Sequence, residues 1–151
     1  MNKNIKLNIG KIQSIFINPY YTCNNNCAYC AIGDTNSLDY KIKMNVLQHC
    51  TKNTLKFIID IQEELENNCQ FIFLGGEPLI TWHSWLIPFI KELKNINNNF
   101  TYRLSTNGVL LTSDKYSDIE KYQIDINFSL DGPQYVHDLN RKLISGAGSF
   151  D

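Results

Sequence analysis

Three cysteines form the part of this chain with the most specific chemistry. Cys23, Cys27 and Cys30 are spaced CxxxCxxC, and no fourth cysteine lies close to them in sequence. A structural zinc site takes four protein ligands, whereas a cubane iron–sulfur cluster held by three thiolates keeps one iron free to bind another molecule. The spacing therefore favours a metal centre with one open position.

The other two cysteines, Cys50 and Cys69, stand alone, and five is an odd number, so the cysteines make a poor disulfide framework. We expect both to be buried thiols, Cys50 on the inner face of a helix. The polar start, Met1–Gly10, has no apolar signal segment, and no run reaches the roughly 20 apolar residues that cross a membrane. These features predict a cytoplasmic protein that does not interact with membranes.

Composition limits the class of partner. The chain has 151 residues, of which 43% are hydrophobic and 19% charged, with a net charge of -1. It can bury a core as one domain, which we expect over residues 12–151 after an N-terminal extension of residues 1–11. Because no basic stripe is present, nucleic-acid binding is not favoured, and a small-molecule or peptide substrate is.

Hydrophobic patterning predicts alternating strands and helices. Helices are indicated by apolar faces at steps of three and four, first from Leu47 through Leu65 and then from Leu86 to Leu93, and a third begins after Thr112 or Ser113. Strands are predicted at 12–17, 71–74, 100–104 and 124–130. The β-α-β order favours a parallel α/β sheet with helical crossovers.

Small and polar residues follow each predicted strand. The segments are the cysteine loop, Gly75-Gly76-Glu77-Pro78, Ser105-Thr106-Asn107-Gly108 and Ser129-Leu130-Asp131-Gly132. Parallel α/β folds bind ligands at this edge of the sheet. Successive side chains of a strand point to opposite faces of the sheet. In the fourth predicted strand, we expect one face to pack on helices through Ile124, Ile126, Phe128 and Leu130. Ser129 and Asp131 then lie on the other face.

With these motifs, the chain resembles the N-terminal part of radical S-adenosylmethionine (SAM) enzymes. That family carries CxxxCxΦC with an aromatic Φ, here Tyr29, and a GGE motif, here Gly75 to Glu77. The segment from Ser129 to Pro133, with His137, Asp138 and Arg141 and the end at Gly146–Asp151, is similar to the SPASM or twitch subgroup of sulfatase and peptide maturases. The fold implied is a partial (βα) barrel.

The resemblance also implies the cofactors and their ligands. Cys23, Cys27 and Cys30 would each hold one iron of a [4Fe-4S] cluster, and SAM would chelate the fourth; an electron passed to the cluster then cleaves SAM and gives a 5′-deoxyadenosyl radical. Glu77 would accept from the SAM ammonium beside Gly75 and Gly76, and Tyr29 would shield the cluster. Candidates for the SAM carboxylate or ribose are Ser105, Asn107, Ser129 and Asp131.

Arg141 is expected on a helix surface rather than at a carboxylate, and no catalytic base is identifiable. The resemblance implies an oxidoreductase reaction that modifies a peptide or protein. It also implies a reducing electron donor such as flavodoxin or ferredoxin.

The chain departs from the family in length. The family core has six βα units, whereas four strands are predicted here, and Ser149-Phe150-Asp151 resembles the start of another helix. We therefore expect a truncated core or fragment with its last strand exposed as an edge, or a chain completed by a partner polypeptide. The alternatives in function are a noncatalytic iron–sulfur-binding remnant and a zinc-binding structural domain with Cys50, Cys69 or a histidine as fourth ligand.

Overall fold

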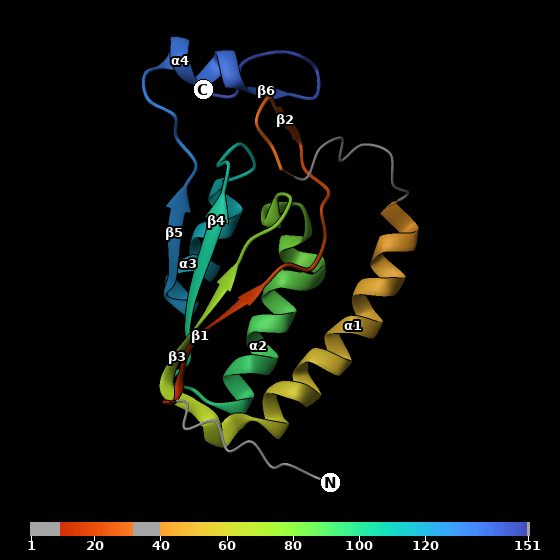
Figure 1. Ribbon diagram of the computed structural model, residues 1–151, viewed down its shortest axis with the longest axis vertical. Coiled ribbons are helices and arrows are strands. Elements are labelled where there is room, and N and C mark those ends of the chain that lie inside the picture. The colour runs from red at the N-terminus through yellow and green to blue at the C-terminus, as the bar shows by residue number, and fades with distance from the viewer. Residues whose placement is uncertain (1–9, 32–39, 151) are drawn as a thin grey trace, which may run out of the picture.

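The computed structural model describes residues 10–31 and 40–150, and its centre is a four-stranded parallel sheet (Figure 1). The strand order is β1-β3-β4-β5, and a separate two-stranded sheet joins β2 and β6. The strands are β1 (Ile12–Ile17), β2 (Asn25–Cys27), β3 (Leu65–Phe73), β4 (Thr101–Thr106), β5 (Ile124–Phe128) and β6 (Arg141–Leu143). The α-helices are α1 (Tyr40–Asp60), α2 (Ile87–Ile96), α3 (Tyr116–Tyr122) and α4 (Gln134–Asn140).

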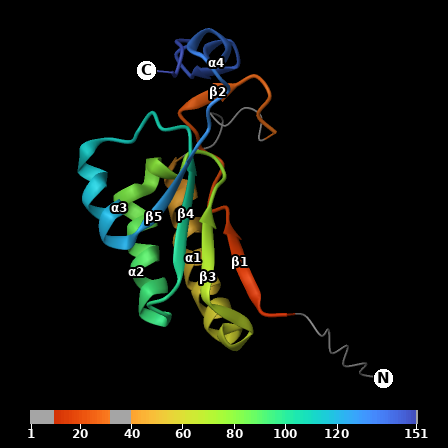
Figure 2. The same cartoon turned by 90° about the vertical axis from the view of Figure 1, so that its left-hand side faces the viewer.

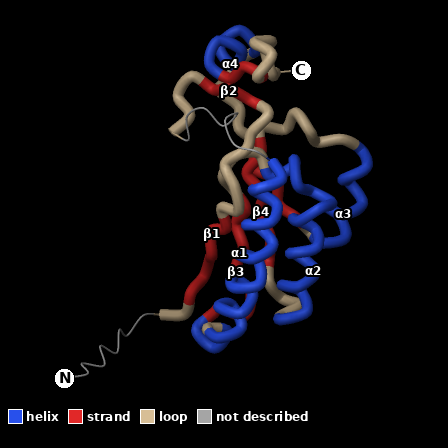
Figure 3. Tube along the Cα trace, turned by 90° about the vertical axis from the view of Figure 1, so that its right-hand side faces the viewer, coloured by secondary structure: helices blue, strands red, loops and turns tan. Residues whose placement is uncertain are grey.

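Helices α1, α2 and α3 cover one face of the main sheet, as the views in Figures 2 and 3 show. The core lies between these helices and the alternate residues of each strand that face them. Phe71 and Phe73 of β3 and Leu104 of β4 are fully buried there. The ring of Phe73 meets that of Phe89 in α2 edge to face, with centroids 6.1 Å apart. Every second residue of the strands is therefore buried against the apolar faces of the helices, where hydrophobic residues recur every three or four positions.

Helix α2 follows from its local sequence. Ile87, Ile90 and Leu93 recur at three-residue steps and are buried, and Pro88 lies in the first turn, where its missing N–H breaks no helical hydrogen bond. A short 3₁₀ turn at Pro78–Thr81 and a π turn at Trp82–Leu86 lead from the loop after β3 into this helix. The helix is thus tied to the segment that carries the predicted Gly-Gly-Glu motif.

The predicted α/β class and parallel order are confirmed, with corrections at two places. Helix α1 ends at Asp60, and Leu65, expected on its inner face, instead begins β3 after a 3₁₀ turn at Gln62–Glu64. Cys50, also expected to be buried, is exposed. The reason is an open cavity of about 350 Å³ between β1 and α1, which Cys50 lines together with Phe16 and Phe57. Cys69 is buried, as expected.

Strand β5 is the edge of the main sheet, where it pairs with β4 only among the described strands. Ile124 is buried against the helices, but Phe128 and Leu130 are 54% and 63% exposed. The expected apolar face therefore packs on helices at its first residues only. The exposed edge strand that the sequence predicted is present.

The small sheet was not predicted. Strand β2 comes from the cysteine loop and pairs antiparallel with β6, with Cys27 opposite Arg141 and Asn25 opposite Leu143. Figure 1 shows β2, β6 and α4 together beyond the edge of the main sheet where β4 and β5 end. The described helices include none that is long and apolar enough to cross a membrane.

Candidate functional site

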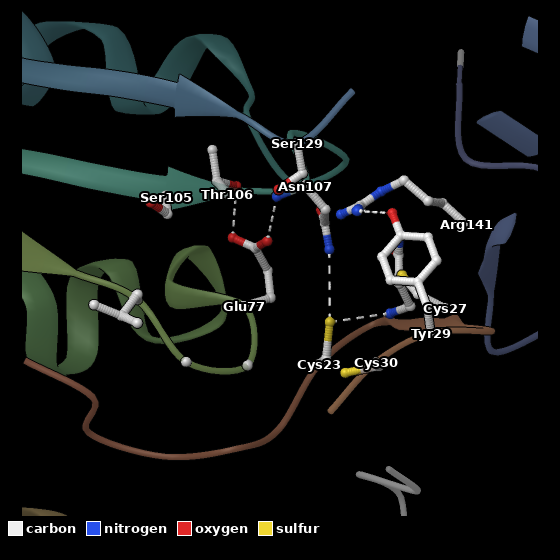
Figure 4. A pocket seen from close by; sticks show the side chains of 14 residues that line it. Cys23, Cys27, Tyr29, Cys30, Glu77, Ser105, Thr106, Asn107, Ser129 and Arg141 are labelled. Carbon is white, nitrogen blue, oxygen red and sulfur yellow. Dashed lines mark hydrogen bonds between the residues drawn. The ribbon is translucent and has the colours of Figure 1, made fainter. Parts of the chain in front are cut away.

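A cavity of about 280 Å³ lies where β3, β4 and β5 end, between the main sheet and the β2–β6 sheet (Figure 4). Ten of the eleven residues proposed from sequence for metal and cofactor binding line it; the eleventh, Asp131, does not. The lining residues are Cys23, Asn25, Cys27, Tyr29, Cys30, Leu74, Gly75, Gly76, Glu77, Ser105, Thr106, Asn107, Ser129 and Arg141. Five segments that are separated in sequence therefore meet at the edge of the sheet where parallel folds bind ligands.

The sulfur of Cys23 is surrounded by hydrogen-bond donors. Its Sγ accepts a hydrogen bond from the backbone N–H of Asn25 at 3.4 Å and from Nδ2 of Asn107 at 3.7 Å. Burial raises the pKa of the Cys23 thiol, the Asn25 N–H lowers it, and the negative charge of Glu77 raises it again. Donors aimed at the sulfur stabilise the thiolate, which is the form that binds metal.

Cys27 and Cys30 are partly buried and, like Cys23, form no disulfide. Burial raises the pKa of the Cys27 thiol, and the nearby guanidinium of Arg141 acts in the opposite direction. The backbone N–H of Cys30 donates to the carbonyl of Cys27 at 3.1 Å, so the end of the loop is a tight turn. Three free thiols on one short loop thus face a common cavity.

The Gly75-Gly76 turn packs directly on the cysteine loop. The N–H of Gly76 donates to the carbonyl of Tyr20 at 3.1 Å, and that of Glu77 donates to the carbonyl of Thr22 at 2.8 Å. A Cβ at Gly76 would lie 2.0 Å from the Thr22 carbonyl oxygen, and Gly75 has a φ of 125°. Glycine is therefore required at both positions to bring the two loops together.

Glu77 is a buried carboxylate, 1% exposed. Its Oε1 accepts from the N–H of Leu79 at 3.0 Å and from Oγ1 of Thr106 at 2.7 Å, and its Oε2 accepts from the N–H of Asn107 at 2.8 Å. Burial raises the pKa of the Glu77 carboxyl, and these donors lower it. The side chain thus joins the loop after β3 to the end of β4 while it lines the cavity.

The end of β4 contributes residues from both of its faces. Ser105 and Asn107 line the cavity, and Asn107 also donates from Nδ2 to Oδ1 of Asn24 at 2.8 Å, which ties β4 to the cysteine loop. Thr106 was missed by the sequence reasoning because its parity places it on the helix side. Its hydroxyl nevertheless reaches Glu77, a contact that only the fold reveals.

Ser129 lines the cavity, and its N–H donates to the carbonyl of Thr106 at 2.9 Å. Asp131 lies outside the lining, and its carboxylate accepts the hydroxyl proton of Tyr29, whose oxygen lies 2.7 Å from Oδ1 and 2.5 Å from Oδ2. Arg141 Nη1 also donates to that hydroxyl, at 2.7 Å, and lies 3.7 Å from Asp131 Oδ1. Tyr29, Asp131 and Arg141 therefore form one network at the side of the cavity.

The expectation that Arg141 is a solvated helix residue is wrong. It begins β6, its side chain is 12% exposed, and it lines the cavity. A buried guanidinium beside a free thiol makes this corner of the cavity favourable for anions. Sequence could have indicated the position only through its spacing from the segment at Ser129, since no local pattern predicts that β6 pairs with the cysteine loop.

The donor set suits a cluster with an open position. Three unpaired thiols, N–H donors to Cys23 and a cavity rich in backbone and amide groups are what an iron–sulfur centre with a further ligand requires. Within residues 10–31 and 40–150, no three His, Cys, Asp or Glu side chains are arranged to hold a single metal ion.

Comparison with known proteins gives consistent matches. The family model of the Radical SAM superfamily matches residues 17–151. The cysteine-type anaerobic sulfatase-maturating enzyme of Clostridium novyi (strain NT) is 31% identical over 150 residues, which cover 93% of this chain and 38% of the relative. The radical SAM cyclopropyl synthase TigE of Paramaledivibacter caminithermalis is 29% identical over 127 residues, 76% of this chain and 26% of that protein.

Solved structures give the same fold. The structure of native anSMEcpe with bound AdoMet has a TM-score of 0.66 and 25% identity, and it covers 91% of this chain and 37% of the other. A second, with bound AdoMet and Cp18Cys peptide, has a TM-score of 0.70 and 24% identity over 91% of this chain and 36% of the other. The chain thus spans less than two fifths of the length of each of these relatives.

Proposed function

This chain belongs to the radical SAM superfamily, and from that premise we propose that its cavity binds a [4Fe-4S] cluster and SAM. Cys23, Cys27 and Cys30 would each bind one iron, and SAM would occupy the open position. When bound, these groups supply reductive cleavage of SAM and the 5′-deoxyadenosyl radical. The observation that carries the proposal is the convergence of the three thiols with the Gly75–Glu77 turn and the ends of β4 and β5 on one 280 Å³ cavity.

The residues of the chain have distinct roles in this proposal. The Gly75-Gly76 turn lets the backbone approach the methionine part of SAM, and Glu77 carries the negative charge that its ammonium group requires. Among the described residues, Glu77 Oε2 accepts one hydrogen bond, from the N–H of Asn107, which leaves acceptor capacity on that oxygen. Ser129 would donate to the SAM carboxylate or a ribose hydroxyl, with Ser105 and Asn107 as its neighbours in the lining.

Tyr29, Asp131 and Arg141 would act as a group. Arg141 supplies a positive charge at the cavity wall, and the Tyr29 hydroxyl between it and Asp131 fixes its orientation. Asp131 would therefore contribute by orienting Tyr29 and Arg141 rather than by binding SAM directly. Tyr29 would shield the cluster from water at this side.

For the substrate, we propose a peptide or protein. The supporting observation is the similarity to sulfatase-maturating enzymes, together with the relative that was solved with a Cp18Cys peptide. A reducing protein such as flavodoxin or ferredoxin would supply the electron. The proposed reaction class is an oxidoreductase step in peptide maturation.

The experiment is anaerobic reconstitution of the 151-residue chain with iron and sulfide, followed by iron analysis and a test for 5′-deoxyadenosine. We expect about four irons per chain and SAM cleavage. Cys27→Ala should lose both, while Cys50→Ala, at an exposed cysteine outside the cavity, should keep both. A cluster without SAM cleavage would instead select the noncatalytic binding domain, and one zinc per chain with no cluster would select the structural zinc domain.

A further inference from the structure

Three buried polar side chains have no role in the proposed chemistry; Asn25 belongs to the cavity lining, and His137 and Ser149 lie outside it. His137 of α4 is 2% exposed, Ser149 is 7% exposed and Asn25 of β2 is 4% exposed. Asn25 Nδ2 donates to Ser149 Oγ at 3.2 Å, and His137 Nε2 lies 3.1 Å from the same oxygen. We refer to His137, Ser149 and Asn25 as the polar hub.

The direction of the hydrogen bonds follows from the partners. The N–H of Asp131 donates to Nδ1 of His137 at 3.4 Å, so in the neutral ring the proton is on Nε2 and points at Ser149. Ser149 in turn donates its own proton to the carbonyl of Arg141 at 2.7 Å. The hydroxyl thus makes one donated and two accepted bonds, which is its full capacity.

This direction excludes a nucleophilic Ser–His pair. A general base must accept the serine proton, whereas His137 donates to Ser149 and the serine proton goes to a backbone carbonyl. The hydrogen bonds of the polar hub therefore link neighbouring segments and do not activate Ser149 as a nucleophile.

What the polar hub connects is the cysteine loop. Asn25 lies between Cys23 and Cys27, and its own N–H donates to Cys23 Sγ. On the other side of the polar hub, the residue whose carbonyl Ser149 binds, Arg141, is the β-sheet partner of Cys27. Both ends of the Cys23–Cys27 segment are thus held through Ser149.

The surrounding backbone supports the same segment. The N–H of Ala28 donates to the carbonyl of Asn140 at 2.8 Å, and that of Ile144 donates to the carbonyl of Asn24 at 3.1 Å. The position of Ser149 is itself fixed, because its N–H donates to Oδ1 of Asp138 at 2.9 Å. These bonds place a rigid support behind the loop.

We propose that His137 and Ser149 are positioning residues for the cluster: through Asn25 they hold the Cys23–Cys27 segment in the shape that three thiolates on one cluster require. The inference rests on the proposed [4Fe-4S] function and extends it to residues outside the cavity lining. Metal centres depend on such supports, because residues behind the ligands fix the ligand geometry.

The first test is Ser149→Ala in the reconstituted chain. We expect the variant to bind iron but to lose its visible absorption to a chelator about tenfold faster than the wild type, in the range found when such supports are removed from metal sites. Ser149→Thr, which keeps the hydroxyl, should restore most of the retention. Ser145→Ala, at an exposed serine of the same segment, is the matched control and should behave as the wild type.

The second test needs no metal, so it separates this inference from the proposed function. In the chain without cluster, Ser149→Ala should raise hydrogen–deuterium exchange of the peptide over residues 22–31 several-fold and leave that of β3 and β4 unchanged. If the wild type takes up no iron, the proposed function fails, and this measurement still decides the role of the polar hub. Equal exchange in residues 22–31, wild-type chelator loss or global unfolding of the variant would each overturn the positioning role.

Discussion

The hydroxyl of Thr106 donates a 2.7 Å hydrogen bond to the carboxylate of Glu77, and both side chains are buried. The bond crosses from the end of β4 to the loop after β3, so it joins two of the segments that form the cavity. Buried carboxylates are tolerated where donors compensate for lost water. Thr106 therefore makes a charge-assisted contact that stabilises the walls of the cavity.

Removal of the Thr106 hydroxyl should lower the free energy of unfolding. Thr106→Val keeps the shape of the side chain but leaves Glu77 Oε1 with only the Leu79 N–H, so we expect about 1–3 kcal/mol lower free energy of unfolding in urea titrations. Thr101→Val, at the exposed start of the same strand, is the control and should change it by about 0.5 kcal/mol or less. Equal effects at the two positions would contradict the assigned role of Thr106.

The Glu77 carboxyl should also make stability depend on pH. Burial raises its pKa above the ordinary 4.5, so the folded chain holds this proton more tightly than the unfolded chain does. The stabilisation from this proton is full below the unfolded pKa and is lost as pH rises through the raised folded pKa. We expect the stability of the wild type relative to Glu77→Gln to fall as pH rises from about 4 toward neutrality.

That comparison is made by urea titration at a series of pH values. Glu63→Gln in the exposed turn after α1 controls for the loss of a surface carboxylate. A stability difference between wild type and Glu77→Gln that stays constant with pH would show that burial does not control this carboxyl.

A methyl group at Gly76 should separate the two loops of the site. Its position would be 2.0 Å from the Thr22 carbonyl oxygen, which is backbone and cannot turn aside. We expect Gly76→Ala to lower the free energy of unfolding by about 2 kcal/mol or more and to reduce iron uptake. Gly10→Ala, where a Cβ meets nothing within 4 Å, should leave both unchanged. Normal iron uptake by Gly76→Ala would mean that the loops can separate without loss of the site.

Loss of the Tyr29 hydroxyl should lower the affinity for SAM and change the stability of the fold little. Tyr29→Phe removes the group that bridges Asp131 and Arg141, so the guanidinium loses one of its anchors. We expect SAM affinity in the reconstituted chain, measured by calorimetry, to fall about fivefold, which corresponds to about 1 kcal/mol. Because Tyr29 is half exposed, thermal unfolding should change little. The control is Tyr135→Phe in α4, and unchanged affinity in Tyr29→Phe would remove the bridge from the proposed site.

Local patterns were sufficient for the main sheet. Strand β1 has the predicted bounds, and the order of strands and crossover helices follows from chain order and the rule for parallel connections. The pattern failed at Leu65, because a residue that continues a helical face can equally begin a buried strand. The prediction that Cys50 is buried failed because the helical pattern does not show whether a cavity lies opposite the residue.

The residues of the candidate site were predictable where they belong to one short sequence motif. The cysteines, the Gly-Gly-Glu turn and the ends of β4 and β5 were identified by type and spacing, and the fold brings them together. Thr106, Arg141 and the polar hub depend on contacts between segments that are distant in sequence, such as Asn25 with Ser149, 124 residues apart. No local signal encodes such pairs.

The pairing of β2 with β6 has a consequence for the order of events in folding. Because β6 follows the cysteine loop by more than 100 residues in sequence, with Cys27 opposite Arg141, the loop cannot take its final shape until β6 has been synthesised. The main sheet forms through shorter crossovers, and contacts of high sequence separation form late because their closure costs more entropy. The cysteine loop should therefore become ordered after the main sheet, and a cluster bound by its three thiols would be inserted only once β6 is in place.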